Sequence, residues 1–368
     1  MKARAVQLAY RFVAADQRGA QIDHPLFDLL KAVHESGSIQ RAATALGQSY
    51  RHVWGELKRW ESEIGEPLVV WAKGQPARLT PFAQRLLWAE ARARTRLVPH
   101  IEALRLELER VIAEAVDGTQ LPLTVWASHD LALPLLQEQA RRNHALHLEL
   151  RFAGSIDALR ALAEGRCMVA GFHVPPLTDA RHVFAGALKP LLKPGVHKLI
   201  GCTRRWQGLM LQHGNPLAIT SLADLPPRHA RFVHRQPGSG TRLLTDHLLQ
   251  RAGLAPDALV GPATLVEDSH LAVAAAVASD AADAGIGLQA AAAAFGLAFL
   301  PLVEEDYFLV CLADQLESPE VGALRDALDS AQWPQAVQTL PGYAAASAGE
   351  VLSLTRALPW WRFRTAKS

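Results

Sequence analysis

Hydroxyl side chains recur where the larger, C-terminal part of the sequence passes from a strand pattern into a helix pattern. Ser128, Ser155, Ser239, Thr241 and Ser269 all stand at or just before the start of an expected helix. Helix N-termini carry unpaired N–H groups and the positive end of the helix dipole, so they bind anions, and a hydroxyl adds a further donor. Each serine taken alone has a simpler role as a helix cap. Several that meet at one cleft favour a binding site for a small anion.

The segment PGSGTR, at residues 237–242, strengthens this prediction. Gly238 and Gly240 let the main chain approach a ligand closely, and Arg242 brings a guanidinium group with several donors. The segment lacks the spacing of a Walker A loop and of the Gly-x-Gly-x-x-Gly fingerprint, which argues against a nucleotide ligand.

The sequence contains no pattern typical of catalysis. It has no Gly-x-Ser-x-Gly nucleophile elbow, and its 15 histidines form no His-Glu-x-x-His motif. His129-Asp130 and Asp268-Ser269-His270 are neighbours in sequence, which does not make a triad, and helix caps are the simpler interpretation. The cysteines Cys167, Cys202 and Cys311 have no Cys-x-x-Cys spacing, so neither disulfides nor a zinc site is predicted. We therefore expect no enzyme activity, no cofactor and no metal.

A second set of polar side chains lies near the N-terminus, in a helix-turn-helix pattern. Residues 24–33 and 39–46 show helical spacing of apolar residues, Gly47 permits a tight turn, and Ser49 can cap a longer helix to about Glu63. In a helix-turn-helix the second helix enters the DNA major groove with its N-terminal residues toward the bases. The residues at that position are Ser49, Tyr50, Arg51 and His52.

A wing is expected after these helices. Residues 67–80 (PLVVWAKGQPARLT) are typical of two short strands around a turn. Lys73 at the tip and Arg78 on the return strand then reach DNA phosphates, whose contacts supply most of the sequence-independent affinity. For Tyr50, packing against the protein is an equal alternative to base contact.

Charge separates the two ends of the chain. Residues 1–100 carry 15 basic and 9 acidic side chains, a net of +6, whereas residues 101–368 carry a net of −4, and the whole chain is +2. A basic head suits a polyanion such as double-stranded DNA. With 368 residues, 49% of them hydrophobic, the chain is long and apolar enough for two or three compact units. No segment resembles a leader or a membrane span, so we expect a cytoplasmic protein without a membrane partner.

A long helix is expected between the two ends. Pro81–Val116 contains no glycine, and its apolar residues recur at heptad spacing, which is typical of a coiled-coil seam. Those residues are Leu97, Ile101, Leu104, Leu108, Val111 and Ala115. The seam predicts a homodimer or homotetramer on a pseudo-palindromic operator, and packing on the chain's own core is the alternative. Pro99 is expected to kink the helix because it removes one helical hydrogen bond.

From Leu121 onward, short apolar strands alternate with helices, as in LTVWAS followed by LALPLLQEQARR. This alternation predicts a parallel, doubly wound sheet whose ligands gather beyond the carboxyl ends of the strands. Two such series suit a two-lobed, hinged receptor, with residues 202–215 and 304–307 as candidate crossovers. The tail, residues 346–368, is dense in tryptophan and arginine, and both a neighbouring subunit and DNA stay open as its contact.

The N-terminal region resembles known regulators. SIQRAATALGQSYRHVWGELKRWE followed by EPLVVWAKGQPARLTPFAQRLL is similar to the DNA-binding domain of the molybdate-responsive ModE regulators and, more distantly, of LysR-type regulators. The resemblance covers about residues 20–117, and its specific parts are Gln48–Arg51, Trp54 and the step at Leu79-Thr80. It implies DNA contacts by Ser49, Tyr50, Arg51, His52, Lys58, Lys73 and Arg78. For Lys58 an ordinary surface charge is the alternative.

The C-terminal part resembles the type 2 periplasmic-binding-protein fold, in particular the PBP-like domain found beside molybdopterin-biosynthesis and ModE-type modules. The residues that carry this resemblance are RQPGSGTRLLTDHLL, EDSHLAVAAAVASDAADAGIG and FLPLVEEDYFLV, within about residues 121–345. In that fold the ligand lies between two lobes. This implies ligand contacts by Ser128, Ser155, Ser239, Gly240, Thr241, Arg242, Ser269 and His270. Tyr307 is a weaker candidate for the hinge or the ligand.

The predicted fold is multidomain. It places an all-α winged helix-turn-helix at residues 1–80, a linker and dimerisation helix at 81–117, a two-lobed α/β PBP-like effector domain at 118–345 and a tail at 346–368. The predicted function is a one-component transcriptional regulator that senses molybdate, tungstate or a molybdenum-cofactor-related anion. Arg235 and Arg242 leave a small organic carboxylate open, because neutral donors usually hold a bare oxyanion. An accessory protein or enzyme of molybdenum-cofactor biosynthesis is the remaining alternative.

Overall fold

The computed structural model describes residues 25–71, 76–95, 97, 101, 121–176, 183–255, 258–259 and 265–361. The chain divides into two compact units, Met1–Glu102 and Ala103–Ser368, and each is described by itself. This division falls inside the predicted linker helix, and the predicted boundaries after residues 80, 117 and 345 stay predictions. Within the described part of the chain, every helix is too short or too polar to cross a membrane.

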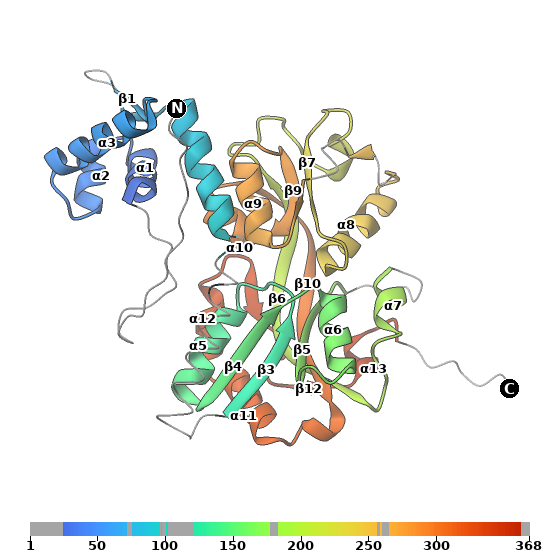
Figure 1. Ribbon diagram of the computed structural model, residues 1–368. Helices are drawn as coiled ribbons and strands as arrows, with labels where there is room; N and C mark the ends of the chain where they lie inside the picture. Colours follow the sequence, from blue (N-terminus) through green and yellow to red (C-terminus); the bar gives the residue numbers. More distant parts are fainter. Residues whose placement is uncertain are drawn as a thin grey trace. The chain divides into compact units, whose positions relative to one another are not determined.

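The first unit is a helix-turn-helix followed by a short hairpin (Figure 1). Its elements are α1 (Pro25–Ser36), α2 (Ile39–Ala45), α3 (Tyr50–Ile64), β1 (Val69–Val70) and β2 (Arg78–Leu79). Ser38 and Ser49 cap α2 and α3, because each hydroxyl accepts a main-chain N–H of the first helical turn. Between these helices Gly47 has a φ of 64°, a left-handed conformation that glycine adopts without steric cost. The predicted turn is therefore confirmed.

One apolar core holds the three helices together. Leu30, Val33, Val53 and Leu57 are buried in it, at the helical spacing that the sequence shows. Ala43 is fully buried as well, and its small side chain lets α2 pack closely on the helices beside it.

The hairpin has the form predicted for a wing. β1 and β2 are antiparallel, with Val69 opposite Leu79. Glu61 of α3 holds the start of the hairpin, because its carboxylate accepts the main-chain N–H of Leu68 at 2.9 Å and of Val69 at 3.3 Å. Burial alone would raise the pKa of Glu61, but Lys58 and these two N–H groups lower it.

A further helix over residues 81–95 follows the hairpin. Thr80 caps it, since its hydroxyl accepts the N–H of Ala83 at 3.1 Å. Leu97 and Ile101 of the predicted heptad seam are helical and half-buried. The remaining predicted positions outside the described residues are Lys73, Pro99, Leu104, Leu108, Val111 and Ala115. The dimerisation seam therefore stays a prediction.

The second unit is built on one long mixed sheet. Its strands are β3 (Leu121–Ala127), β4 (Leu146–Phe152), β5 (Val169–Val174), β6 (His197–Leu211), β7 (Phe232–Arg235), β8 (Val266–Glu267), β9 (Ala284–Leu288), β10 (Ala298–Leu312), β11 (Tyr343–Ala345) and β12 (Val351–Leu352). The order across the sheet is β4-β3-β5-β10-β6-β9-β7-β8, and β11 and β12 pair with β6. β3 is parallel to β4 and β5, and β7 is parallel to β8 and β9.

The prediction of an all-parallel sheet is wrong for the two central strands. β6 and β10 are 15 residues long and run antiparallel to each other and to their neighbours β9 and β5. Both strands run from one lobe into the other, so the predicted crossover segments lie largely on them (Figure 1). β6 begins in the apolar run HKLIGCT and continues through Arg204 and Arg205, whose charges conceal the length of the strand in the sequence.

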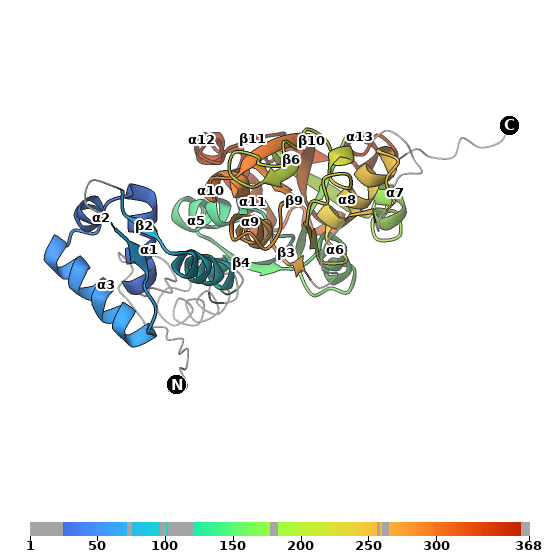
Figure 2. The same cartoon turned by 90° about the horizontal axis from the view of Figure 1, so that it is seen from above.

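Helices cover both faces of each lobe (Figure 2). They are α5 (Leu133–Asn143), α6 (Ser155–Ala163), α7 (Val183–Leu188), α8 (Gly240–Arg251), α9 (His270–Ala278), α10 (Gln289–Ala294), α11 (Pro319–Asp329), α12 (Gln332–Gln338) and α13 (Leu354–Ala357), with 3₁₀ turns at Leu222–Asp224 and Ala313–Gln315. In the lobe of β3, β4 and β5, one core contains α5 with α11 and another contains α6 with α7. In the other lobe, α9 and α10 join the first core, while α8 places Leu244 in the core of α6 and α7 and Leu249 in a separate one.

The C-terminal segment packs into the first lobe. β12 pairs with β6, and α13 follows directly. Trp360 is fully buried in the core that α6 and α7 line, and the Nζ of Lys189 lies 5.7 Å from the centre of one of its rings. The idea that this tail contacts a neighbouring subunit or DNA is therefore wrong for Trp360, because its own lobe buries the side chain. Residues 362–368 lie outside the described part.

Candidate functional site

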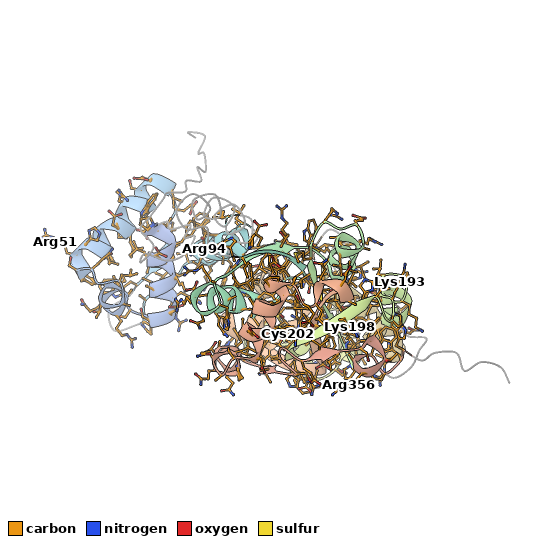
Figure 3. The ribbon with its side chains drawn as sticks, turned by 90° about the horizontal axis from the view of Figure 1, so that it is seen from below. Arg51, Arg94, Lys193, Lys198, Cys202 and Arg356 are labelled. Atoms are coloured by element: carbon orange, nitrogen blue, oxygen red, sulfur yellow. The ribbon has the colours of Figure 1, made fainter. Side chains whose placement is uncertain are left out.

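The N-terminal end of α3 presents polar side chains to solvent. Arg51 and His52 are exposed, and Arg51 points away from the ribbon of its own unit (Figure 3). The hydroxyl of Ser49 accepts the N–H of His52 at 3.2 Å, so its established contact is the helix cap. Arg78 is exposed on β2. The placement leaves these side chains free of the core, as a DNA-binding surface requires.

Tyr50 belongs to a row of aromatic rings that joins α3 to the wing. It is 40% exposed and stacks on Trp54, with ring centroids 6.3 Å apart, and Trp54 meets Trp71 at 6.1 Å. Tyr50 therefore packs on a neighbour and still reaches solvent. Lys58 lies over the Trp54 ring and pairs with Glu61 at 2.6 Å, so it has a local partner beside its predicted DNA contact.

In the second unit, the start of α6 in one lobe faces the start of α8 in the other. A Cβ at Gly154, the N-cap of α6, would lie 2.6 Å from the carbonyl oxygen of Gly238. A Cβ at Gly240, the first residue of α8, would lie 3.1 Å from the Oγ of Ser155. Gly154 thus lets the lobes meet main chain to main chain, and Gly240 lets the main chain of α8 meet side chains of the other lobe. Two helix N-termini therefore bring their unpaired N–H groups to one place.

Three buried hydroxyl groups belong to this region. The Oγ of Ser128, the Oγ of Ser155 and the Oγ1 of Thr241 have no hydrogen-bond partner among the described residues. Ser128 follows β3, Ser155 begins α6 and Thr241 lies in the first turn of α8, so the hydroxyls come from both lobes. A buried polar group without a partner costs about 1–3 kcal/mol. Such donors at the edge between two lobes are typical of a ligand site.

Arg235, at the end of β7, adds a buried positive charge. It is 5% exposed, and one Nη donates to the main-chain oxygen of Asp268 at 2.7 Å. Its Nε and its other Nη have no partner among the described residues. Burial lowers the pKa of Arg235 to about 10, although Asp268 opposes the shift, so the group is still charged at neutral pH. Because an unpaired buried cation is costly, the open side of this guanidinium could hold an anion.

A network of buried charges lies next to these donors. Glu305 of β10 has its Oε2 2.6 Å from the Nδ1 of His173 and accepts the Nε–H of Arg205 at 2.8 Å. Arg205 also pairs with Asp130, whose carboxylate accepts the hydroxyl of Tyr343 at 3.1 Å. Burial alone would raise the pKa of Glu305, but His173 and Arg205 lower it to about 2. Arg205 thus has carboxylates on two sides, unlike the guanidinium of Arg235.

His270, at the start of α9, contributes an uncharged imidazole. It is buried, and its Nδ1 has no partner in the described part of the chain. Burial, and then the nearby Arg235 and Arg205, hold the pKa of His270 well below its usual value. At neutral pH the ring therefore offers one donor and one acceptor nitrogen.

Several predicted ligand contacts have local partners. The hydroxyls of Ser239 and Ser269 cap α8 and α9 by accepting main-chain N–H groups at 3.1 and 3.2 Å. Arg242 turns along α8 to Asp246 at 3.2 Å and is partly exposed, so Arg235 and not Arg242 is a buried cation here. Tyr307 lies in the core, where its hydroxyl donates to the main-chain oxygen of Ser128 at 3.3 Å.

Sequence reasoning missed three residues of the site. His173, Arg205 and Glu305 lie inside β5, β6 and β10, where the prediction followed only the apolar pattern. The available signal was a charged or polar side chain within an otherwise apolar run, as in FLPLVEEDYFLV, because such residues are seldom buried without a partner. Among the residues that the structure describes, no group of His, Cys, Asp and Glu is arranged to hold a metal ion.

Replacing Glu305 with glutamine is expected to remove a pH-dependent part of the stability. Because its folded pKa of about 2 lies below the ordinary value, the carboxylate contributes stability that is present above about pH 5 and lost as pH falls toward 2. Glu305→Gln should lower the free energy of unfolding by about 3 kcal/mol at neutral pH, and the difference should shrink in acid. Urea unfolding at a series of pH values measures this difference.

Glu304→Gln is the matched control, because Glu304 is 42% exposed and lies 4.0 Å from Arg204. It should change the free energy of unfolding by less than about 1 kcal/mol at any pH. A constant deficit of Glu305→Gln across the pH range would contradict the linkage.

Comparison with known families assigns both units. Residues 136–329 match the PBP superfamily domain, and residues 26–84 match the helix-turn-helix of the bacterial regulatory proteins of the LysR family. The chain belongs to the PBP superfamily and carries a LysR-type DNA-binding domain. This PBP-like, LysR-type regulator thus joins a DNA-binding helix-turn-helix to an effector-binding domain. The predicted LysR-type and PBP-like resemblances are confirmed, whereas the likeness to ModE stays a prediction.

The chain is similar to one sequence relative and to two solved structures. Uncharacterized protein YvgK of Bacillus subtilis (strain 168) is 31% identical over 232 residues, which are 63% of this chain and 74% of the relative. Hydrogen-peroxide-bound OxyR of Corynebacterium glutamicum is 17% identical, with 86% of this chain and 92% of its own covered and a TM-score of 0.44. Full-length CbnR in complex with its target DNA is 17% identical, with 82% of this chain and 96% of its own covered and a TM-score of 0.40.

Proposed function

We propose that this LysR-type regulator binds operator DNA through α3 and the wing and closes its two lobes on a small oxyanion, molybdate or tungstate. The observation that carries the anion site is the buried guanidinium of Arg235, with two nitrogens that lack a partner among the described residues, and the choice of a bare oxyanion rests on the neutral donors beside it. The unpartnered hydroxyls of Ser128, Ser155 and Thr241 support it. A tetrahedral oxyanion accepts hydrogen bonds from several directions, which suits donors that come from two lobes and two helix N-termini.

The sensing step follows from the two-lobed construction. An anion that contacts donors of both lobes binds the closed arrangement more tightly than an open one, and it therefore shifts the population toward closure. In a homodimer or homotetramer held by the predicted seam at residues 97–115, that shift changes the spacing of the DNA-binding units. Oligomerisation and operator symmetry are parts of the proposal.

A small organic carboxylate would find the same donors, and one experiment separates the two classes. Thermal unfolding of the full chain is recorded with molybdate, tungstate, sulfate and a panel of small carboxylates, and the active anion is then added to a gel shift on the chain's own promoter region. An anion present at about 100 times its Kd stabilises the folded protein by about 2.7 kcal/mol. If only carboxylates stabilise the protein, a carboxylate and not molybdate or tungstate is the effector. If no condition gives a specific shift of the DNA, the proposal that the protein is a regulator is wrong.

Arg51→Ala is expected to weaken operator binding by about tenfold or more, because an exposed arginine at the start of a recognition helix supplies about 1–3 kcal/mol of contact energy. Arg59→Ala is the matched control on the same helix, since Arg59 is paired with Glu56 at 2.6 Å and is placed two turns further along. Fluorescence anisotropy with labelled promoter DNA measures both variants. Equal losses in both would show that α3 acts only through its overall charge.

A further inference from the structure

The anion site contains an acceptor where an anion needs a donor. His173 of β5 has its Nδ1 2.6 Å from the Oε2 of Glu305. Glu305 is a carboxylate at neutral pH, since its pKa is about 2, so the Nδ1 of His173 must carry the hydrogen of this bond. In a neutral imidazole the other ring nitrogen, Nε2, then has a bare lone pair.

This nitrogen lies at the meeting point of the two lobes. A Cβ at Gly240 would lie 2.5 Å from the Nε2 of His173 and 3.1 Å from the Oγ of Ser155. Glycine at the start of α8 therefore lets the imidazole and the hydroxyl come close to the main chain of α8. An anion held by Ser155 and the N-terminus of α8 would place an oxygen close to Nε2.

Charged and titratable groups surround this imidazole. They are Glu305 of β10, Arg205 of β6, Arg235 of β7 and His270 of α9. The neighbouring α6 and α8 add the Ser155 hydroxyl and the Gly240 main chain. Burial lowers the pKa of His173, Glu305 opposes this shift, and Arg205 and Arg235 add to it, so the ring is neutral before an anion arrives. An arriving dianion reverses that balance, because a negative charge in contact favours the protonated imidazole.

We propose that the site binds its anion together with one proton, which the Nε2 of His173 shares with an oxygen of the anion. The inference depends on the proposed anion site and narrows its effector to an oxyanion held in monoprotonated form. A full dianion such as molybdate takes one proton from solvent, and the imidazolium then lies between the anion and Glu305. Hydrogen phosphate brings its own proton. Without that proton, the nitrogen lone pair and the anion oxygen would face each other as two acceptors.

Calorimetric titration of the full chain tests the proton directly. Molybdate, tungstate and inorganic phosphate are titrated at about pH 8 in two buffers of different ionisation enthalpy, because the difference in apparent heat gives the protons taken up. We expect about one proton per molybdate or tungstate and none for hydrogen phosphate. The affinity for molybdate should fall about tenfold for each unit of rising pH.

His173→Gln removes the titrating ring, and the expected result is molybdate binding without proton uptake. His197→Gln is the matched control. His197, the first residue of β6, is also buried, but its Nδ1 accepts the main-chain N–H of Lys193. It should bind molybdate with the wild-type proton uptake. If His173→Gln does not fold, the ¹⁵N shifts of the wild-type histidine rings decide, because molybdate should convert one bare ring nitrogen into a protonated one.

The outcomes separate this inference from the proposed function. Tight binding of molybdate or tungstate without proton uptake overturns the shared proton and leaves the anion site intact. Uptake that persists in His173→Gln places the proton on another group and overturns the role of His173. No binding by any of the three anions removes the proposed oxyanion effector, and the inference is lost with it.

Discussion

Replacing Arg235 with methionine is expected to abolish effector binding while the effector-free protein stays as stable as the wild type or becomes more stable. The two unpartnered nitrogens of this guanidinium would each give an anion a charge-assisted hydrogen bond, worth about 1.5–3 kcal/mol, so the affinity should fall at least about 100-fold. The buried charge, by contrast, is a cost to the free protein. A buried charge without an ion pair has no Coulombic gain to offset its desolvation, so its exchange for an apolar side chain of similar volume should be neutral or stabilising.

The matched control for this variant is Arg231→Met, at the residue directly before β7 and four positions before Arg235. Arg231 pairs with Asp283 at 2.7 Å and is 41% exposed. It should lose a little stability, less than about 1 kcal/mol, and keep full effector affinity. Thermal unfolding with and without the active anion measures both quantities. An Arg235→Met protein that is several kcal/mol less stable without effector would show that Arg235 is structural.

The DNA-binding unit could be predicted closely because its signals are local. The serine caps at Ser38 and Ser49, the turn at Gly47 and the helical spacing of the apolar residues each act over a few positions. The direction of β6 and β10 could not be predicted in the same way. Strand direction is decided by pairing between residues about 100 positions apart, such as Arg205 with Glu305, and no local pattern encodes it.

The sequence predicts the residues of the candidate site that lie at helix starts, but not the residues that lie inside strands. Ser155 and Thr241 lie where a helix-start argument puts them, with buried hydroxyls. Arg242 was expected in the site, but Asp246 stands four residues later on α8, a spacing that favours a pair along the helix surface. Arg235 is the last residue of β7. Ligands of such sheets bind beyond the carboxyl ends of the strands, so a side chain at this position can reach one.

Replacing Arg205 with methionine is expected to be the most destabilising single change in the effector domain, at about 3–5 kcal/mol. The arginine is fully buried and compensates the carboxylates of Asp130 and Glu305, which are themselves buried. Its removal leaves both carboxylates in the interior without a cation, and this uncompensated charge is the source of the loss. Urea unfolding at neutral pH measures it.

Arg204→Met, at the adjacent residue, is the control, because Arg204 pairs with Asp306 at 2.7 Å but is 48% exposed. Its loss should cost less than about 1 kcal/mol, since water already solvates both partners. The decisive variant combines Arg205→Met with Asp130→Asn and Glu305→Gln. If unpaired charge causes the loss, neutralising both carboxylates should restore most of the stability, whereas three independent losses that add up would show that the network acts through packing.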